Sequence, residues 1–157
     1  MIHRIFIHGL ESSNQGTKAV FFREKFPDMI LPFFEGPLTE RMESLNRILS
    51  GKSEIRIVGS SFGGLMAALF AMENPSQVAR MILLAPAINM IEAAPGKKET
   101  VDMPVSIYHG TQDTVIPLSE VQHMAPAYFA DLSFHVVDDD HFLHKTFKAL
   151  DWHSLLA

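Results

Sequence analysis

Short apolar runs alternate along the chain with longer stretches in which apolar residues recur every three or four positions. The runs are rich in Ile, Val and Phe and have the length of strands; they are residues 5–7, 29–31, 55–58, 81–84, 105–108 and 134–137. Helical spacing between them predicts helices at about residues 19–26, 38–49, 62–74, 117–124 and 143–150. The hydrophobicity of these runs is continuous rather than alternating, as in parallel sheets that are covered on both faces. The pattern therefore predicts a three-layer α/β/α fold around a mostly parallel six-stranded sheet.

The length and composition fit one globular domain. No repeat or linker divides the 157 residues, and a content of 47% hydrophobic and 20% charged residues is typical of a compact domain. We therefore expect residues 1–157 to form a single domain. The longest irregular stretch, residues 86–104, contains a Pro-Gly pair and is predicted to be flexible or functional.

The charge pattern excludes several classes of partner. The formal net charge is −5, and the longest basic cluster is the pair Lys97-Lys98, so we expect neither nucleic-acid nor anionic-membrane binding. The absence of cysteine excludes disulfides, thiolate metal sites and a cysteine nucleophile. The amino terminus has no signal-peptide pattern, which predicts a cytoplasmic protein. The most apolar stretch, residues 81–91, is far shorter than the roughly 20 residues of a membrane-spanning helix. The oligomeric state is left open.

The sequence Gly-Ser-Ser-Phe-Gly at residues 59–63 lies between a predicted strand and a predicted helix. In that context the pattern is typical of a nucleophile elbow, in which small neighbours allow a strained turn to raise one side chain. The raised residue is Ser61, and the N–H of Phe62 at the helix start points toward an oxyanion formed on a substrate. The alternative is a glycine-serine turn that only reverses the chain. The presence of an acid and a histidine elsewhere in the sequence must decide between the two.

Two partners follow in the order that a serine triad requires. Asp113 lies in the loop after the predicted strand at residues 105–108, and His141 lies just past the strand at residues 134–137. Alone, Asp113 is typical of a turn or a helix cap. A divalent metal held by Asp138, Asp139, His141 and His144 is a second alternative, although neighbouring residues seldom complete a coordination sphere and we expect no metal. Asp113 is preferred as the acid because an aspartate adjacent to His141 cannot easily reach its Nδ1.

The first predicted strand ends in His-Gly-Leu at residues 8–10, which would border the elbow if strands one and three are neighbours. The N–H of Leu10 is then the second oxyanion donor, beside that of Phe62. Glu11 is unexpected next to that donor, because a carboxylate opposes developing negative charge unless it points to solvent. Its role is left open.

Taken together, the segments at residues 8–10, 59–64, 109–113 and 140–141 resemble the signature segments of the α/β-hydrolase superfamily, in the same order. Within it, His-Gly-Leu-Glu-Ser-Ser at residues 8–13 is similar to the early segment of small lidless bacterial esterases. The resemblance implies that the first two strands of the superfamily's sheet are absent, which leaves the order 2-1-3-4-5-6. It also implies a domain without a large lid, because only residues 86–104 stand where lidded members insert one.

These inferences predict a serine hydrolase of small carboxylic esters or thioesters that forms an acyl-enzyme and needs no cofactor. Ser61 attacks, His141 relays the proton and Asp113 orients the imidazole. Residues of the 86–104 segment are expected to form the apolar wall that binds the substrate, namely Ile88, Met90 and Ile91. An acyltransferase or peptidase could use the same triad, and an inactive binding module on this fold is the alternative from another class.

Overall fold

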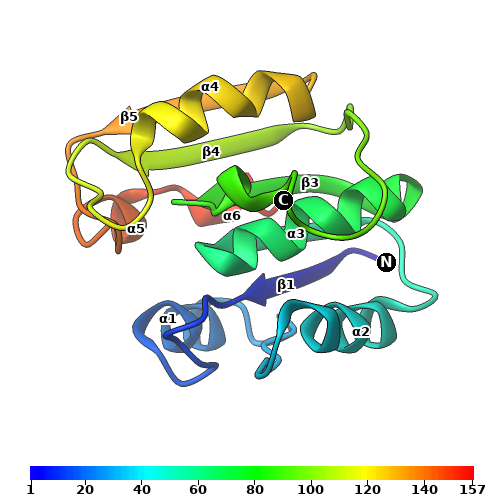
Figure 1. Cartoon of the computed structure of the whole chain (residues 1–157). Coiled ribbons are helices and arrows are strands. Elements are labelled where there is room, and N and C mark those ends of the chain that lie inside the picture. The colour runs from blue at the N-terminus through cyan, green and yellow to red at the C-terminus, as the bar shows by residue number, and fades with distance from the viewer.

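The computed structural model describes all of residues 1–157 and confirms the α/β class (Figure 1). Five parallel strands lie side by side in the order in which they occur along the chain. They are β1 (His3–Ile7), β2 (Ile55–Ser60), β3 (Val78–Leu84), β4 (Val105–Gly110) and β5 (Leu132–Val137). Because the strands are parallel, all of their carboxyl ends meet at one edge of the sheet, where α/β proteins carry their binding sites.

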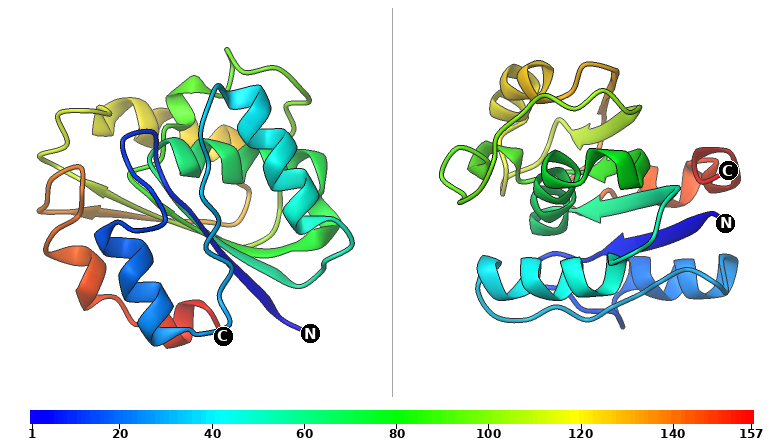
Figure 2. Two further views of the ribbon diagram at one scale, coloured as in Figure 1. Left: turned by 90° about the horizontal axis from the view of Figure 1, so that it is seen from below. Right: turned by 90° about the vertical axis from the view of Figure 1, so that its right-hand side faces the viewer.

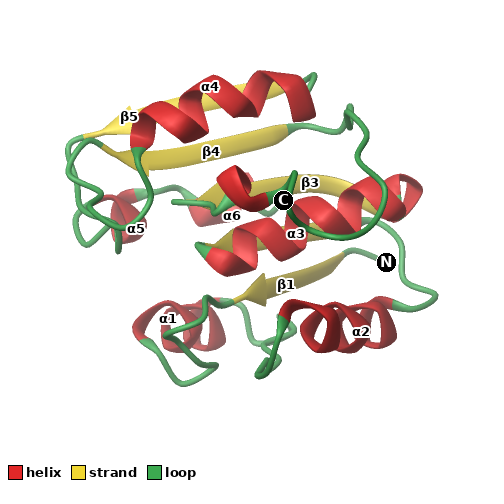
Figure 3. Cartoon of the chain, viewed as in Figure 1, coloured by secondary structure: helices red, strands yellow, loops and turns green.

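Helices cover both faces of this sheet, which gives the predicted three layers (Figures 2 and 3). One face packs against α2 (Leu38–Leu49), α3 (Phe62–Glu73) and α4 (Leu118–Tyr128), and the other against α1 (Thr17–Lys25), α5 (Thr146–Ala149) and α6 (Trp152–Leu155). Alternate residues of β1 enter the two cores, since Ile5 and Ile7 belong to one and Phe6 to the other. The helix α3 is apolar on all sides because it is enclosed between the sheet and its neighbours.

The predicted strand at residues 29–31 is reduced to a single bridge. Ile30 lies beside Ile5 in parallel orientation and exchanges two backbone hydrogen bonds with the Arg4 carbonyl and the Phe6 N–H. Pro32 follows at once and has no N–H to continue the ladder. The sheet therefore has five strands rather than six, although the predicted order is kept, with this bridge on the outer side of β1.

The carboxyl-terminal region also departs from the prediction. Instead of one helix over residues 143–150, the chain forms the two four-residue helices α5 and α6. The edge strand β5 has no buried residue and is half exposed, in contrast to β3, in which five of the seven residues are buried. None of the helices combines the length and apolar character needed to span a bilayer. Two three-residue 3-10 helices, η1 (Pro75–Gln77) and η2 (Ile88–Met90), complete the secondary structure.

Candidate active site

Ser61 stands on a sharp turn between β2 and α3. Its φ of 55° and ψ of −117° lie in a region that L-residues rarely occupy, so the turn is strained. Glycines make the turn possible by allowing close approach of backbones. A Cβ at Gly59 would lie 2.6 Å from the Gly63 carbonyl oxygen, and a Cβ at Gly63 would lie 2.0 Å from that of Ile7. The backbone thus has the form of the predicted nucleophile elbow.

The structure brings Ser61, His141 and Asp113 together from three separate loops. The Ser61 hydroxyl lies 3.1 Å from His141 Nε2, and His141 Nδ1–H donates to Asp113 Oδ2 at 2.7 Å. Because the carboxylate only accepts, the proton of the neutral imidazole sits on Nδ1, which leaves Nε2 free to accept the serine proton. The His141 side chain is 10% exposed and that of Asp113 is fully buried. The arrangement can therefore activate a hydroxyl at a site that a substrate can reach.

Asp113 accepts three hydrogen bonds, one of them from His141. Its Oδ1 accepts hydrogen bonds from the N–H groups of Val115 and Ile116, at 2.9 and 2.8 Å. Its Oδ2, besides His141, lies 3.2 Å from Nε2 of His109, whose Nε2–H donates to the Ile116 carbonyl at 2.9 Å. The side chain of His109 is fully buried and its Nδ1 has no partner. His109 thus supports the carboxylate from behind and keeps its own proton on Nε2.

The three aspartates next to His141 have other partners. Asp139 is buried and accepts hydrogen bonds from the backbone N–H groups of Asp140, Lys145 and Thr146, at 2.8, 3.0 and 2.7 Å. These hydrogen bonds hold the pKa of Asp139 below its usual value, although burial acts to raise it. Asp140 pairs with His144 at 2.5 Å, and Asp138 accepts from the side chain of Gln112. Asp113 is therefore the aspartate that contacts His141, and Asp139 fixes the loop that carries His141.

The backbone N–H groups of Phe62 and Leu10, the two predicted oxyanion donors, follow Ser61 and Gly9 in the chain. Neither donates to another group of the protein. The loop of Leu10 passes directly over the elbow, because a Cβ on Gly9 would lie 3.3 Å from Ser61 Cβ and 3.9 Å from Phe62 N. This loop is anchored by His8, whose Nδ1–H donates to the Gly9 carbonyl at 2.7 Å. The arrangement can bind an oxyanion formed at a carbonyl that Ser61 attacks.

His8 and His109 are buried histidines that the sequence did not identify as parts of the site. His8 Nε2 accepts a hydrogen bond from the Phe34 N–H at 2.9 Å, so both ring nitrogens are used. Burial lowers the pKa of His8 and of His109, which keeps both imidazoles neutral near pH 7. The signal was present in the sequence, since each histidine precedes a glycine at the end of a strand within a signature segment. The partners, however, depend on contacts that no spacing rule gives.

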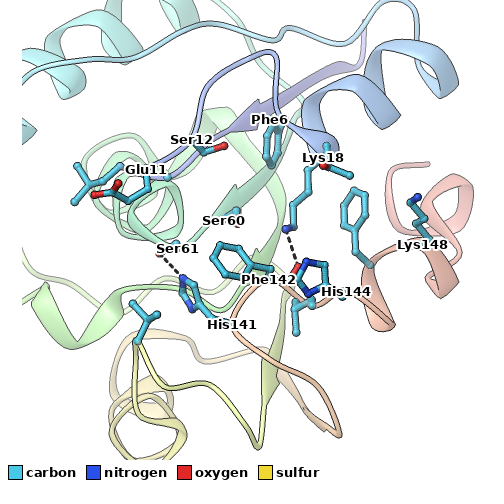
Figure 4. A pocket seen from close by; sticks show the side chains of 16 residues that line it. Phe6, Glu11, Ser12, Lys18, Ser60, Ser61, His141, Phe142, His144 and Lys148 are labelled. Atoms are coloured by element: carbon cyan, nitrogen blue, oxygen red, sulfur yellow. Dashed lines mark hydrogen bonds between the residues drawn. The ribbon is translucent and has the colours of Figure 1, made fainter.

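A cavity of about 540 Å³ opens at Ser61 and His141 (Figure 4). Its mouth is rimmed by the exposed apolar side chains of Leu10, Val115 and Phe142. Glu11 also lines the cavity, is exposed and forms no ion pair. Its carboxylate is therefore free to stay in contact with solvent.

The residues expected to bind the substrate lie elsewhere. Ile88 and Ile91 are completely buried in the core beside α4, and Met90 is 44% exposed on the surface. None of the three lines the cavity. The physical reason is that apolar side chains of residues 86–104, Val101 and Met103 among them, pack into the core. The segment therefore does not cover Ser61. The apolar lining of the cavity comes instead from β1, from the loops after β1, β4 and β5, and from α5.

Comparison with known protein families identifies the family of this chain. Residues 38–146, more than half of the chain and including Ser61, Asp113 and His141, match the family model for phospholipase/carboxylesterase. The chain belongs to this family of α/β hydrolases. One curated relative matches a shorter segment. The match to abhydrolase domain-containing protein lid-1 of Caenorhabditis elegans is 41% identical over 49 residues, which is 31% of this hydrolase and 13% of that protein.

Solved structures share the fold of this hydrolase over nearly its whole length. Alpha/beta hydrolase domain-containing protein 10 from mouse superposes with a TM-score of 0.75 at 20% identity, covering 98% of this chain and 86% of that one. Est1E from Butyrivibrio proteoclasticus, with ferulic acid bound, gives 0.75 at 17% identity, with coverages of 99% and 86%. An esterase from Pyrococcus furiosus gives 0.74 at 16% identity, with coverages of 98% and 79%. At these identities the likeness is one of fold.

Proposed function

We propose that this hydrolase is a serine esterase or thioesterase acting on small carboxylic substrates. The observation that carries the proposal is the hydrogen-bonded chain from Ser61 through His141 to Asp113, with the serine on a strained turn. Strain of this kind costs about 1–3 kcal/mol and persists only where the surrounding structure imposes it; here the glycines of the elbow permit the close backbone packing that holds the turn. Family membership and the esterase among the similar structures support the same reaction class.

In the proposed reaction, Ser61 Oγ attacks the carbonyl carbon while His141 Nε2 takes the hydroxyl proton. The oxyanion of the tetrahedral intermediate is bound by the N–H groups of Phe62 and Leu10. His141 then returns the proton to the leaving alcohol or thiol as its bond to carbon breaks, and an acyl-enzyme remains. A water molecule then attacks the acyl-enzyme while His141 Nε2 takes one of its protons. The imidazole returns this proton to Ser61 Oγ as the bond between Oγ and the acyl carbon breaks, which releases the carboxylic acid and restores Ser61.

We further propose that residues 1–157 act as one domain with an open site and no large lid. The exposure of Leu10, Val115 and Phe142 at the cavity mouth supports this proposal, as does the packing of residues 86–104 into the core. Access of water to the mouth favours hydrolysis over transfer to another acceptor. No step of the reaction requires a cofactor.

The test is labelling with a fluorophosphonate probe, followed by hydrolysis of para-nitrophenyl butyrate. We expect the probe to attach to Ser61 and the substitution Ser61→Ala to abolish both labelling and hydrolysis. The matched control is Ser60→Ala, because Ser60 also lines the cavity but makes no hydrogen bond to His141. Labelling of the Ser61→Ala variant at the wild-type rate would refute the proposal, and equal losses in the two variants would remove the assignment of Ser61 as nucleophile.

A further inference from the structure

The cavity that begins at Ser61 also reaches the space between α1 and the segment of residues 142–148. Its lining there includes Thr17 and Lys18 from α1, and His144, Phe147 and Lys148 from the segment after His141. In Figure 4, Lys18 lies between the Ser61–His141 pair and Lys148. A substrate attached at Ser61 can therefore extend toward two lysines.

The ammonium group of Lys18 is only partly satisfied within the protein. Its side chain is half buried, and Nζ donates one hydrogen bond, to the Phe142 carbonyl at 2.8 Å. The ring of Phe147 lies below it, with 5.5 Å from Nζ to the ring centroid. No carboxylate lies within 4.0 Å of this nitrogen. Two of its three donors therefore remain for a ligand.

Burial without an ion-pair partner is costly for a cation, and it lowers the pKa of Lys18 while Asp140 and Asp139 act in the opposite direction. An anion bound at this ammonium would offset part of that cost.

The other charges around the cavity leave this position cationic. Lys148 forms no ion pair and supplies a second positive charge at the rim. Asp140 is engaged by His144 and by the Phe142 N–H, so its carboxylate is already occupied. Glu11 lies on the other side of Ser61 in Figure 4. The two unpaired lysines make this part of the cavity positively charged, although the net charge of the whole chain is −5.

We propose that the preferred substrate carries a second, negatively charged group, such as a carboxylate or phosphate, which Lys18 binds with Lys148 at the rim while the ester or thioester carbonyl lies at Ser61. The inference rests on the proposed esterase function and deepens it by naming the class of substrate. The anion can belong to the acyl part or to the leaving group, and Lys18 would recognise either. Lys18 is thus proposed as a specificity-determining residue.

The experiment compares each anionic ester with a neutral ester of similar size. For an anion on the acyl part, the pair is mono-para-nitrophenyl glutarate and para-nitrophenyl pentanoate. For an anion on the leaving group, the pair is para-acetoxybenzoate and para-acetoxybenzamide. The variants are Lys18→Gln, which keeps a donor for the Phe142 carbonyl but removes the charge, and Lys18→Arg, which restores the charge. Lys25→Gln, at the far end of the same helix, is the matched control for net charge.

In at least one pair we expect the anionic ester to have the higher kcat/KM, by about tenfold, as for a hydrogen bond to a charged group at a partly exposed site. Lys18→Gln should remove this advantage, mainly through KM, with little change for the neutral ester. Lys18→Arg should recover most of the advantage, and Lys25→Gln should leave it intact. Equal values or a preference for the neutral ester in both pairs, or an equal loss for both esters in Lys18→Gln, would overturn the proposal.

Binding to the Ser61→Ala variant, measured by calorimetry with the same esters, separates this proposal from the esterase function. Tighter binding of the anionic ester that is lost on adding Lys18→Gln supports the anion site whether or not the esters are hydrolysed. Equal binding of both members of each pair overturns it. Hydrolysis that persists in Ser61→Ala would instead contradict the proposed function. The binding measurement would still test the anion site, because it does not depend on hydrolysis by Ser61.

Discussion

The substitution Asp113→Asn tests the proposed role of the acid with little change in shape. The amide oxygen of asparagine can take the place of Oδ1 and accept from the N–H groups of Val115 and Ile116. Its NH₂ group then replaces Oδ2 and faces a donor, Nδ1–H of His141 at 2.7 Å, with Nε2 of His109 3.2 Å away. To avoid this clash of donors, His141 must move its proton to Nε2. It can then no longer accept the proton of Ser61.

The size of the effect follows from this change of tautomer. Loss of the correct tautomer costs about 10⁴ in kcat in the serine-protease example from which the value is known. That factor corresponds to about 5 kcal/mol of transition-state stabilisation. The cost to folding should be smaller, about 1–3 kcal/mol, because the two backbone hydrogen bonds are kept and one charge-assisted bond is lost. Activity should therefore fall far more than stability.

The assay is steady-state hydrolysis of para-nitrophenyl butyrate, with urea denaturation of the same preparations. Asp140→Asn is the matched control, since it removes the same charge one residue from His141 but from a carboxylate paired with His144. We expect it to lose less than tenfold. If Asp113→Asn keeps more than a tenth of the activity while remaining folded, the tautomer explanation is wrong.

Two further predictions concern stability. Burial lowers the pKa of His8 and His109, so the unfolded chain binds protons that the folded chain does not as the pH falls below about 6.5. The free energy of unfolding should therefore fall between pH 7.5 and 5.5, by up to about 1.4 kcal/mol per pH unit for each histidine. Urea titrations check this, and an unchanged slope in His109→Gln would contradict it. Gly63→Ala would bring a Cβ to 2.0 Å from the Ile7 carbonyl oxygen and should lower the thermal midpoint by more than 10 °C in calorimetry or prevent soluble expression. A midpoint equal to that of the native chain would show that the turn relaxes.

Local patterns were enough to predict most of the fold and the order of the candidate site residues. The central strands are mostly apolar, as in the run Met81–Leu84 of β3, and the glycines around Ser61 mark a turn that few other sequences allow. The strand at residues 29–31 was overpredicted because a short apolar run does not show that Pro32 ends its hydrogen bonding. The error in Ile88, Met90 and Ile91 came from placing residues 86–104 where related folds have a lid. The packing of that segment into the core was not visible in its spacing.

The neighbourhood of Lys18 could not be predicted for a different reason. Its position opposite residue 142 depends on the packing of α1 against α5, through Phe22 and Phe147 with ring centroids 5.4 Å apart. Contacts between residues more than a hundred positions apart are set by the tertiary structure. A periodicity argument identifies which face of a helix is buried, but not which side chain it meets.

The three hydrogen bonds that Asp139 accepts from backbone N–H groups have an entropic consequence. They fix the loop of His141 when the chain folds, before any ligand arrives. Immobilising a flexible side chain at an interface costs about 0.5–1.5 kcal/mol when it occurs during binding. For His141 that loss of freedom is part of the folding free energy and does not weaken the affinity for the substrate. The rate of acylation should then depend on how the substrate fits the cavity rather than on an ordering step of the enzyme.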